Sequence, residues 1–246
     1  MEKQRIICYI PCHYGLEYIS QAIQSVHPFV EKIVILYTEN PSYGHGTTMK
    51  CPETEMQLHD LCIASSNKVD WRKIEAGTEG QHRDYILNFA ADYDGILAID
   101  ADEVLDPIDL PIALDLCQKT DKRYIGFAGY INFWKSFNYA CYDGFTPIRY
   151  INLHNSGGEG VVPCKVYHFS TAQSIEIMRY KLEIHGHHDE IRPNWLTDVY
   201  EAWTPENNFT DLHLVAHGIW NATPFDKTQM PDILKAHPNY NKETIE

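Results

Sequence analysis

Short apolar runs alternate with amphipathic stretches over roughly the first hundred residues of the chain. Residues 6–10, 33–37 and 96–99 are apolar runs with the length of buried strands, and residues 69–74 predict a further strand. Between the first two runs, Ile19, Ala22, Ile23 and Val26 recur at the spacing of one helix face. The β-α-β-α-β-α-β order predicts an α/β fold with a mostly parallel central sheet flanked by helices.

The pattern becomes less regular in the second half of the chain. Residues 112–118 and 175–182 predict helices, and residues 124–131 predict a strand. Residues 132–165 are rich in aromatic residues, Gly and Asn, and contain no long periodic segment. No repeat or low-complexity linker separates the two halves, so we expect a single domain over residues 1–246 with a less regular C-terminal part.

Three acidic residues follow the fourth predicted strand directly: Asp100, Asp102 and Glu103. Unpaired charges are costly to bury. Such a cluster therefore fits the C-terminal edge of an α/β sheet, where ligands bind. Carboxylates in an Asp-x-Asp arrangement can hold a hard divalent cation, which makes Asp100 and Asp102 candidate ligands of Mn²⁺ or Mg²⁺. The alternative is a loop of solvated acids.

Composition narrows the classes of partner. The 246 residues carry 34 acids against 20 Lys and Arg, a formal net charge of −14, which disfavours binding to a nucleic acid backbone. The seven cysteines form no CxxC pair, so a zinc ribbon is unsupported and reduced thiols are expected. No signal-peptide core and no apolar run of membrane-spanning length occur. We therefore expect a cytoplasmic protein without a membrane span.

Several segments carry a resemblance to known enzymes. IDADE at 99–103, YIP at 9–11 and QHRDYIL at 81–87 resemble segments of the GT-A glycosyltransferases, the family-2-like group in particular. YHFS at 167–170, KLE at 181–183 and His187 are similar to a block of the β-1,4-mannosyl-glycoprotein β-1,4-N-acetylglucosaminyltransferases. Two positions differ from the family pattern. VY at 166–167 stands where the family has Gly-Trp, and the loop at 37–40 lacks its Asp-x-Ser.

The resemblance implies a single GT-A-like domain. Residues 1–110 would bind a nucleotide-sugar, and residues 111–246 would form the acceptor-side half and the C-terminal tail. It implies a metal-dependent hexosyltransferase, expected to be inverting, that moves a sugar to a glycan or another hydroxyl acceptor. The oligomeric state stays open.

The resemblance also implies roles for particular residues. The residues expected to contact the donor are Pro11, His13, Tyr14, Tyr37, Thr38, Arg83, Asp100 and His187. The residues expected to bind the metal are Asp100, Asp102 and His168. An inverting reaction needs a general base near the acceptor hydroxyl. Its candidates are Asp189 and Glu190, with Asp143 as a further possibility.

Two other classes of function compete with this hypothesis. The first is a nucleotidyltransferase on a similar sheet, although that class usually carries a Gly-rich loop with a basic residue after the first strand. Here the corresponding loop, at 11–15, reads PCHYG. The second is a non-catalytic carbohydrate-binding protein whose site has decayed. The intact Asp-x-Asp motif and His168 argue against decay.

Overall fold

The computed structural model describes residues 4–41, 47–186, 188–207 and 210–245. The chain forms two compact units. The first unit contains Met1–Gly44, Glu53–Tyr130 and Gly144–His168. The second unit contains His45–Pro52, Ile131–Asp143 and Phe169–Glu246. Whether the two units act as the single domain expected from the sequence stays a prediction.

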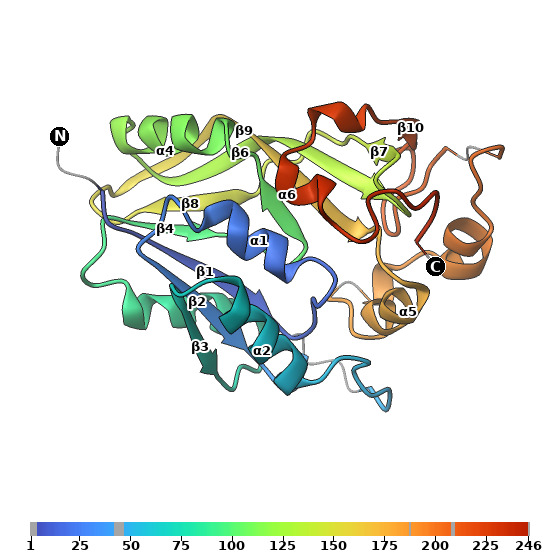
Figure 1. The fold of residues 1–246 in the computed structure, drawn as a ribbon, viewed down its shortest axis with the longest axis horizontal. Helices are drawn as coiled ribbons and strands as arrows, with labels where there is room; N and C mark the ends of the chain where they lie inside the picture. The colour runs from blue at the N-terminus through green and yellow to red at the C-terminus, as the bar shows by residue number, and fades with distance from the viewer. Residues whose placement is uncertain (1–3, 42–46, 187, 208–209, 246) are drawn as a thin grey trace. The chain divides into compact units, whose positions relative to one another are not determined.

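The first unit is built on four parallel strands joined by helices (Figure 1). The strands are β1 (Ile6–Cys12), β2 (Lys32–Tyr37), β3 (Val69–Lys73) and β4 (Gly95–Ala98). They lie in the order β4-β1-β2-β3, and every neighbouring pair is parallel. The connecting helices are α1 (Ile19–Val26), α2 (Glu55–Ser65) and α3 (Glu79–Asp84). A 3₁₀ turn, η1 (Tyr85–Phe89), follows α3. The predicted α/β fold with its mostly parallel sheet is confirmed.

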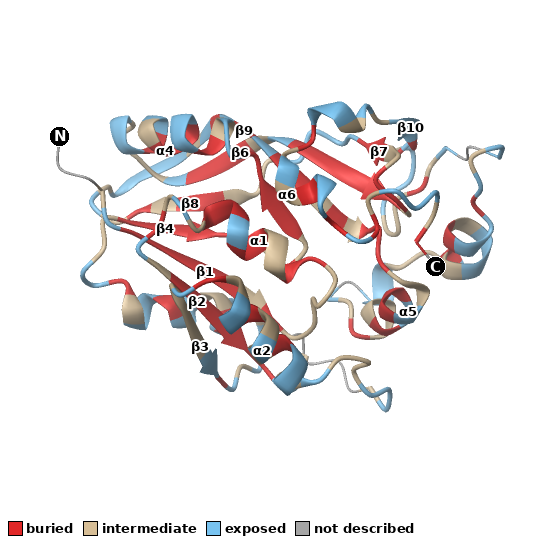
Figure 2. Ribbon diagram, in the orientation of Figure 1, coloured by how far each residue is buried: buried red, intermediate tan, exposed pale blue. Residues whose placement is uncertain are grey.

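Both faces of this sheet are covered, as the buried strands in Figure 2 show. On one face Cys8 and Ile10 of β1 pack with Ile23 of α1. On the other face Ile7 and Tyr9 of the same strand belong to a second apolar cluster, formed with residues of η1. Successive side chains of a strand point to opposite faces, so a strand buried on both faces requires a continuous apolar run.

The sheet continues with antiparallel strands, of which the sequence predicted only β6, as a strand over residues 124–131. β8 (Ile148–Asn152) pairs with β4 and with β6 (Lys122–Trp134). β5 (Glu103–Leu105) pairs with β9 (Gly157–Thr171), and α4 (Asp109–Lys119) follows β5. Residues 132–165, which gave no periodic signal, contain β7, β8 and the first part of β9. β9 alternates exposed and buried positions and starts with two glycines, so its apolar pattern is weak.

The second unit is organised around an aromatic core. It contains α5 (Ile175–Glu183), the π-helical η3 (Leu196–Glu201), and three short elements, η2 (His188–Glu190), η4 (Lys227–Gln229) and α6 (Asp232–Lys235). β7 (Tyr139–Cys141) pairs with the end of β6 and with β10 (Thr223–Pro224). Trp195, Trp203 and Trp220 are buried in one cluster.

Within the described part of the chain, no helix combines the length and the apolar character needed to cross a membrane.

Candidate active site

The three acids follow β4 in a tight turn at the carboxyl end of the parallel strands. The backbone N–H of Glu103 donates to the carbonyl of Asp100 at 3.1 Å. The backbone N–H of Asp100 in turn donates to Glu103 Oε2 at 3.1 Å. Asp102 lies within this turn, and Glu103 begins β5. The turn is therefore closed by both main-chain and side-chain hydrogen bonds.

A buried arginine that the sequence analysis did not identify pairs with two of these acids. Arg149 on β8 is 5% exposed. Its Nη2 donates to Asp100 Oδ2 at 2.8 Å and also to Glu103 Oε1. Its Nε lies 2.6 Å from the hydroxyl oxygen of Tyr130, and that hydroxyl donates to Glu103 Oε1 at 2.9 Å. Two acids, one arginine and one tyrosine thus form a single buried network.

Arg83, expected to face a diphosphate, lies at the same site. Its Nη2 is 3.6 Å from Asp100 Oδ1 and 2.6 Å from Glu79 Oε1. Burial alone would raise the pKa of the Asp100 carboxyl, but Arg149 and Arg83 outweigh it and hold that pKa below its usual range. Asp100 is therefore ionised at neutral pH and held between two arginines.

Asp102 and His168 are brought together by strand pairing. Glu103 and His168 are partners in the ladder between β5 and β9. This register places His168 Nε2 at 3.7 Å from Asp102 Oδ1. Both side chains are partly open to solvent, since that of His168 is 21% exposed and that of Asp102 is 16% exposed. Of the three residues expected to bind metal, the structure therefore groups Asp102 with His168, whereas both oxygens of Asp100 face arginines.

The pair of Asp102 and His168 fits a divalent transition metal. Carboxylate oxygen and imidazole nitrogen are both ligands that Mn²⁺ accepts. Two ligands with bonds of about 2.1 Å to one ion lie about 3.0 Å apart at right angles and about 3.4 Å apart in a tetrahedron, a few tenths of an ångström closer than the 3.7 Å of this pair. Among the described residues, no group of three or more His, Cys, Asp or Glu side chains is placed to hold a metal. This chain's contribution to an ion here would be these two side chains.

The ends of β1 and β2 carry the other residues expected at the donor site. Pro11 lies within β1 opposite Leu36. The imidazole of His13 hydrogen-bonds the carbonyl of Thr38 through Nδ1 at 2.8 Å, and burial lowers its pKa despite that bond. The ring of Tyr14 meets the His13 ring edge-on. The ring of Tyr37 is buried and stacks on Trp71.

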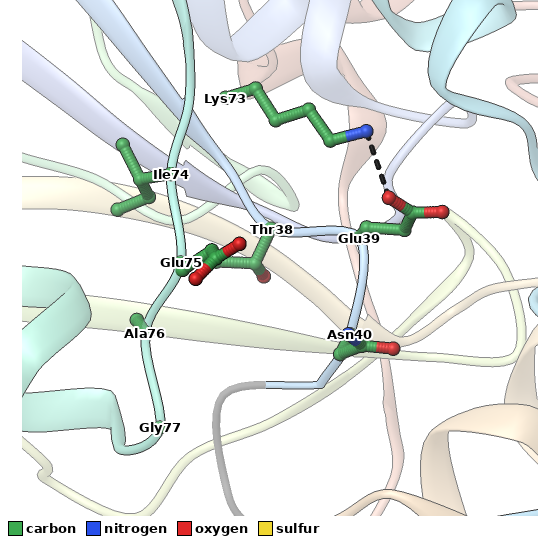
Figure 3. Close-up of a pocket in the computed structure, with 8 residues that line it drawn as sticks. All are labelled: Thr38, Glu39, Asn40, Lys73, Ile74, Glu75, Ala76 and Gly77. Carbon is green, nitrogen blue, oxygen red and sulfur yellow. Dashed lines mark ion pairs between the residues drawn. The ribbon is translucent and has the colours of Figure 1, made fainter.

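A pocket of about 550 Å³ lies beside these strand ends. Figure 3 shows its lining, which comes from the segment after β2 and the segment from the end of β3 toward α3. The lining residues are Thr38, Glu39, Asn40, Lys73, Ile74, Glu75, Ala76 and Gly77. Thr38 is 2% exposed, and its hydroxyl has no hydrogen-bond partner among the described residues. Such a hydroxyl is costly to bury, so it points to a ligand group or an ordered water.

Three of the remaining predicted residues belong to the second unit. Asp189 and Glu190 are exposed in η2 of the second unit. Asp143, also in the second unit, accepts a hydrogen bond from the indole Nε1 of Trp220 at 2.8 Å. His187 lies outside the described residues. The base role of these acids stays a prediction.

Comparison with known proteins gives only distant structural likenesses. No protein family model and no curated protein matches the chain. S. aureus TarS 1-349 aligns with a TM-score of 0.40 and 12% identity, over 60% of this chain and 47% of TarS. Glucosyl-3-phosphoglycerate synthase from Mycobacterium tuberculosis, crystallised with Mn²⁺, UDP-glucose and phosphoglyceric acid, aligns with a TM-score of 0.36 and 19% identity, over 52% of this chain and 44% of the synthase.

A third likeness is to 4-diphosphocytidyl-2C-methyl-D-erythritol synthase from Anaerococcus prevotii. It has a TM-score of 0.47 and 8% identity, over 72% of this chain and 97% of the synthase. The chain spans less than half the length of TarS and of the M. tuberculosis synthase. Because all three TM-scores are below 0.5, these likenesses support no function for this chain, and its function is inferred from the residues of the site.

Proposed function

We propose that this chain is a metal-dependent glycosyltransferase that moves a hexosyl group from a nucleotide-sugar to a hydroxyl acceptor. The observation that carries the proposal is the meeting of Asp102 with His168, beside Asp100 and Arg83, at the carboxyl ends of the parallel strands. A carboxylate, an imidazole and an arginine together suit a bound cation next to a diphosphate. The resemblance of the motif segments to GT-A enzymes supports the same function.

In this proposal Asp102 and His168 hold Mn²⁺ or Mg²⁺. The ion supplies positive charge that stabilises the nucleoside diphosphate leaving group as the glycosidic bond breaks. Arg83 donates to the diphosphate oxygens with its planar guanidinium, which matches phosphate geometry. Asp100, fixed by Arg149, accepts hydrogen bonds from the ribose hydroxyls.

The nucleoside occupies the pocket beside β2 and β3. The buried Thr38 hydroxyl gains a hydrogen-bond partner there. The hydrogen bond between His13 and the Thr38 carbonyl holds the backbone that forms this side of the pocket. The donor residues proposed from the sequence, with His187 among them, remain part of this proposal, as do Asp189 and Glu190 as candidate bases of an inverting reaction on a glycan or another hydroxyl acceptor.

One observation disfavours the nucleotidyltransferase alternative. The backbone N–H groups of Gly15 and Leu16, in the loop after β1, both donate to Glu53 Oε2 at 2.6 and 3.0 Å. A triphosphate at this loop would require those N–H groups. Because an internal carboxylate already accepts from them, the loop suits a structural turn better than a phosphate cradle.

Calorimetry with UDP, GDP, ADP and CDP tests the proposal. We expect one of them to bind tightly with Mn²⁺ and at least about tenfold more weakly in EDTA, because a metal shell contributes at least that factor. We also expect slow hydrolysis of the matching nucleotide-sugar. Equal affinity in EDTA would contradict a metal-dependent donor site. Metal-dependent binding without hydrolysis or transfer would favour the carbohydrate-binding alternative.

A further inference from the structure

We propose that Arg149 is a positioning residue that sets the metal preference of the site, by withdrawing Asp100 and Glu103 from cation binding. This inference rests on the proposed metal role of Asp102 and His168. It concerns a residue that touches neither the donor nor the ion and acts through the acids beside them.

The contacts of Arg149 determine which acids it neutralises. One nitrogen, Nη2, donates to carboxylates of both Asp100 and Glu103. The side chain of Glu103 is 1% exposed, so its charge is tolerated only because Arg149 and the Tyr130 hydroxyl bind it. A guanidinium can bridge three partners in one plane, which an ammonium cannot do.

The same contacts hold the backbone that carries Asp102. Glu103 binds Arg149 through Oε1 and the Asp100 backbone N–H through Oε2. Asp102 is therefore in a turn whose two flanking acids are both fixed by Arg149. The turn presents Asp102 toward His168 across the pairing of β5 and β9.

This arrangement has a consequence for the choice of ion. Three carboxylates within four residues would form an oxygen-rich set, which hard cations such as Ca²⁺ and Mg²⁺ prefer. Because Arg149 binds Asp100 and Glu103, the side chains that remain as ligands are the Asp102 carboxylate and the His168 imidazole. Imidazole suits Mn²⁺ better than Ca²⁺ or Mg²⁺. Arg149 thus biases the site toward Mn²⁺ without contacting the ion.

The test measures Mn²⁺ binding to the protein by electron paramagnetic resonance, with Ca²⁺ as competitor. It is done once with the metal alone and once with the best-bound nucleoside diphosphate added. Arg149→Met removes the guanidinium and keeps an unbranched side chain. We expect Ca²⁺ affinity to rise at least about fivefold while Mn²⁺ affinity changes less. Arg123→Met is the matched control. Arg123 binds the Asn155 carbonyl and contacts none of the acids, so its loss alters net charge equally but should leave the preference unchanged.

A second variant decides the matter if Arg149→Met does not fold. Replacing a buried ion pair by uncharged groups is often tolerated, so Arg149→Met with Glu103→Gln should fold. It frees Asp100 Oδ2, while Arg83 stays near Oδ1. We expect it to gain Ca²⁺ affinity, whereas Glu103→Gln alone, which keeps Arg149 on Asp100, should not. If the folded Arg149 variant keeps the wild-type metal preference, the inference about Arg149 is wrong and the proposed function is unaffected. A wild-type protein that binds no Mn²⁺ under any condition removes the proposed function as well.

Discussion

His168 Nε2 and Asp102 Oδ1 lie 3.7 Å apart, although Asp102 is in the turn before β5 and His168 is in β9, far along the chain. The distance follows from the register of β5 against β9, in which Glu103 faces His168. A shift of one residue in that register would turn His168 to the opposite face of its strand. The pair therefore depends on strand pairing, and its chemistry can be tested by changing either member.

Replacing His168 by Ala should lower sugar transfer at least about tenfold, because a metal ligand is lost. The preference for Mn²⁺ over Mg²⁺ should also shrink, since the remaining ligand is an oxygen. Steady-state rates with each ion measure both effects. His154→Ala is the control, because the exposed His154 pairs with Asp94 instead. Equal rates in the His168 variant would place this imidazole outside the reaction.

Replacing Asp102 by Asn should leave the melting temperature nearly unchanged and remove the metal-dependent part of donor binding. The substitution deletes a charge and keeps the shape of the side chain. Calorimetry with and without Mn²⁺ measures the effect. Asp115→Asn, which removes an exposed acid of α4, serves as control. Persistent Mn²⁺-dependent binding in Asp102→Asn would assign the ion to other ligands.

Replacing Arg83 by Lys should weaken nucleoside diphosphate binding, because a point charge replaces a planar fork. Arg83→Ala should weaken it further and leave Asp100 with Arg149 alone. Dissociation constants of the nucleoside diphosphate, measured with Mn²⁺, test whether affinity falls from the wild type to Arg83→Lys and again to Arg83→Ala. Arg72→Lys provides the comparison, since Arg72 pairs with Asp70 on β3. Wild-type affinity in Arg83→Ala would show that this guanidinium serves the ion pairs only.

Replacing Gly15 by Ala should destabilise the fold by roughly 1–3 kcal/mol, since Gly15 has φ +148° and an added Cβ would lie 2.8 Å from the Cβ of Ala101. Ala101 is the middle residue of the Asp-x-Asp motif, so donor binding should weaken too. Gly144→Ala separates the causes, because Gly144 has φ +72° but nothing within 4 Å of the added atom. Urea denaturation compares the two. An equal cost in both variants would argue that backbone strain alone is responsible.

Stability should fall as the pH drops below about 6.5, in part because of His82. Burial lowers the pKa of His82, against the hydrogen bond to the Leu36 carbonyl at 2.6 Å. Below its ordinary pKa the imidazole takes up a proton in the unfolded chain but not in the folded one, which favours unfolding. His82→Gln should therefore lose less melting temperature between about pH 7.5 and pH 5.5 than the wild type. His59→Gln, at a half-buried position of α2, should behave as the wild type.

The parallel half of the fold could be predicted because three of its four strands, β1, β2 and β4, are buried on both faces. β4 is a continuous apolar run bounded by a turn and by acids, and β1 and β2 are similar. β9 mixes exposed and buried positions and β8 is a short strand of buried and half-buried ones, so their strand character comes from pairing with distant partners. Sequence periodicity carries little information about such partners.

The residues of the site also differ in how clearly the sequence marks them. Asp100 and Asp102 stand out in the sequence because three acids follow an apolar run. Arg149 and Tyr130 gave no comparable signal, since each is a single polar residue in a segment without strong periodicity. A buried strand position occupied by arginine requires an acidic partner. That requirement would have pointed to Arg149 if the strand itself had been recognised.

The pairing of β5 with β9 also has a consequence for the order of events during synthesis. β1, β2 and β3 and their connecting helices are near neighbours in sequence, whereas β9 must return past α4, β6 and β8 to reach β5. Contacts between distant segments form more slowly, because the long loop must close before they contribute. A nascent chain would therefore complete the pocket beside β2 and β3 first, and could meet a nucleotide before His168 has left the ribosome.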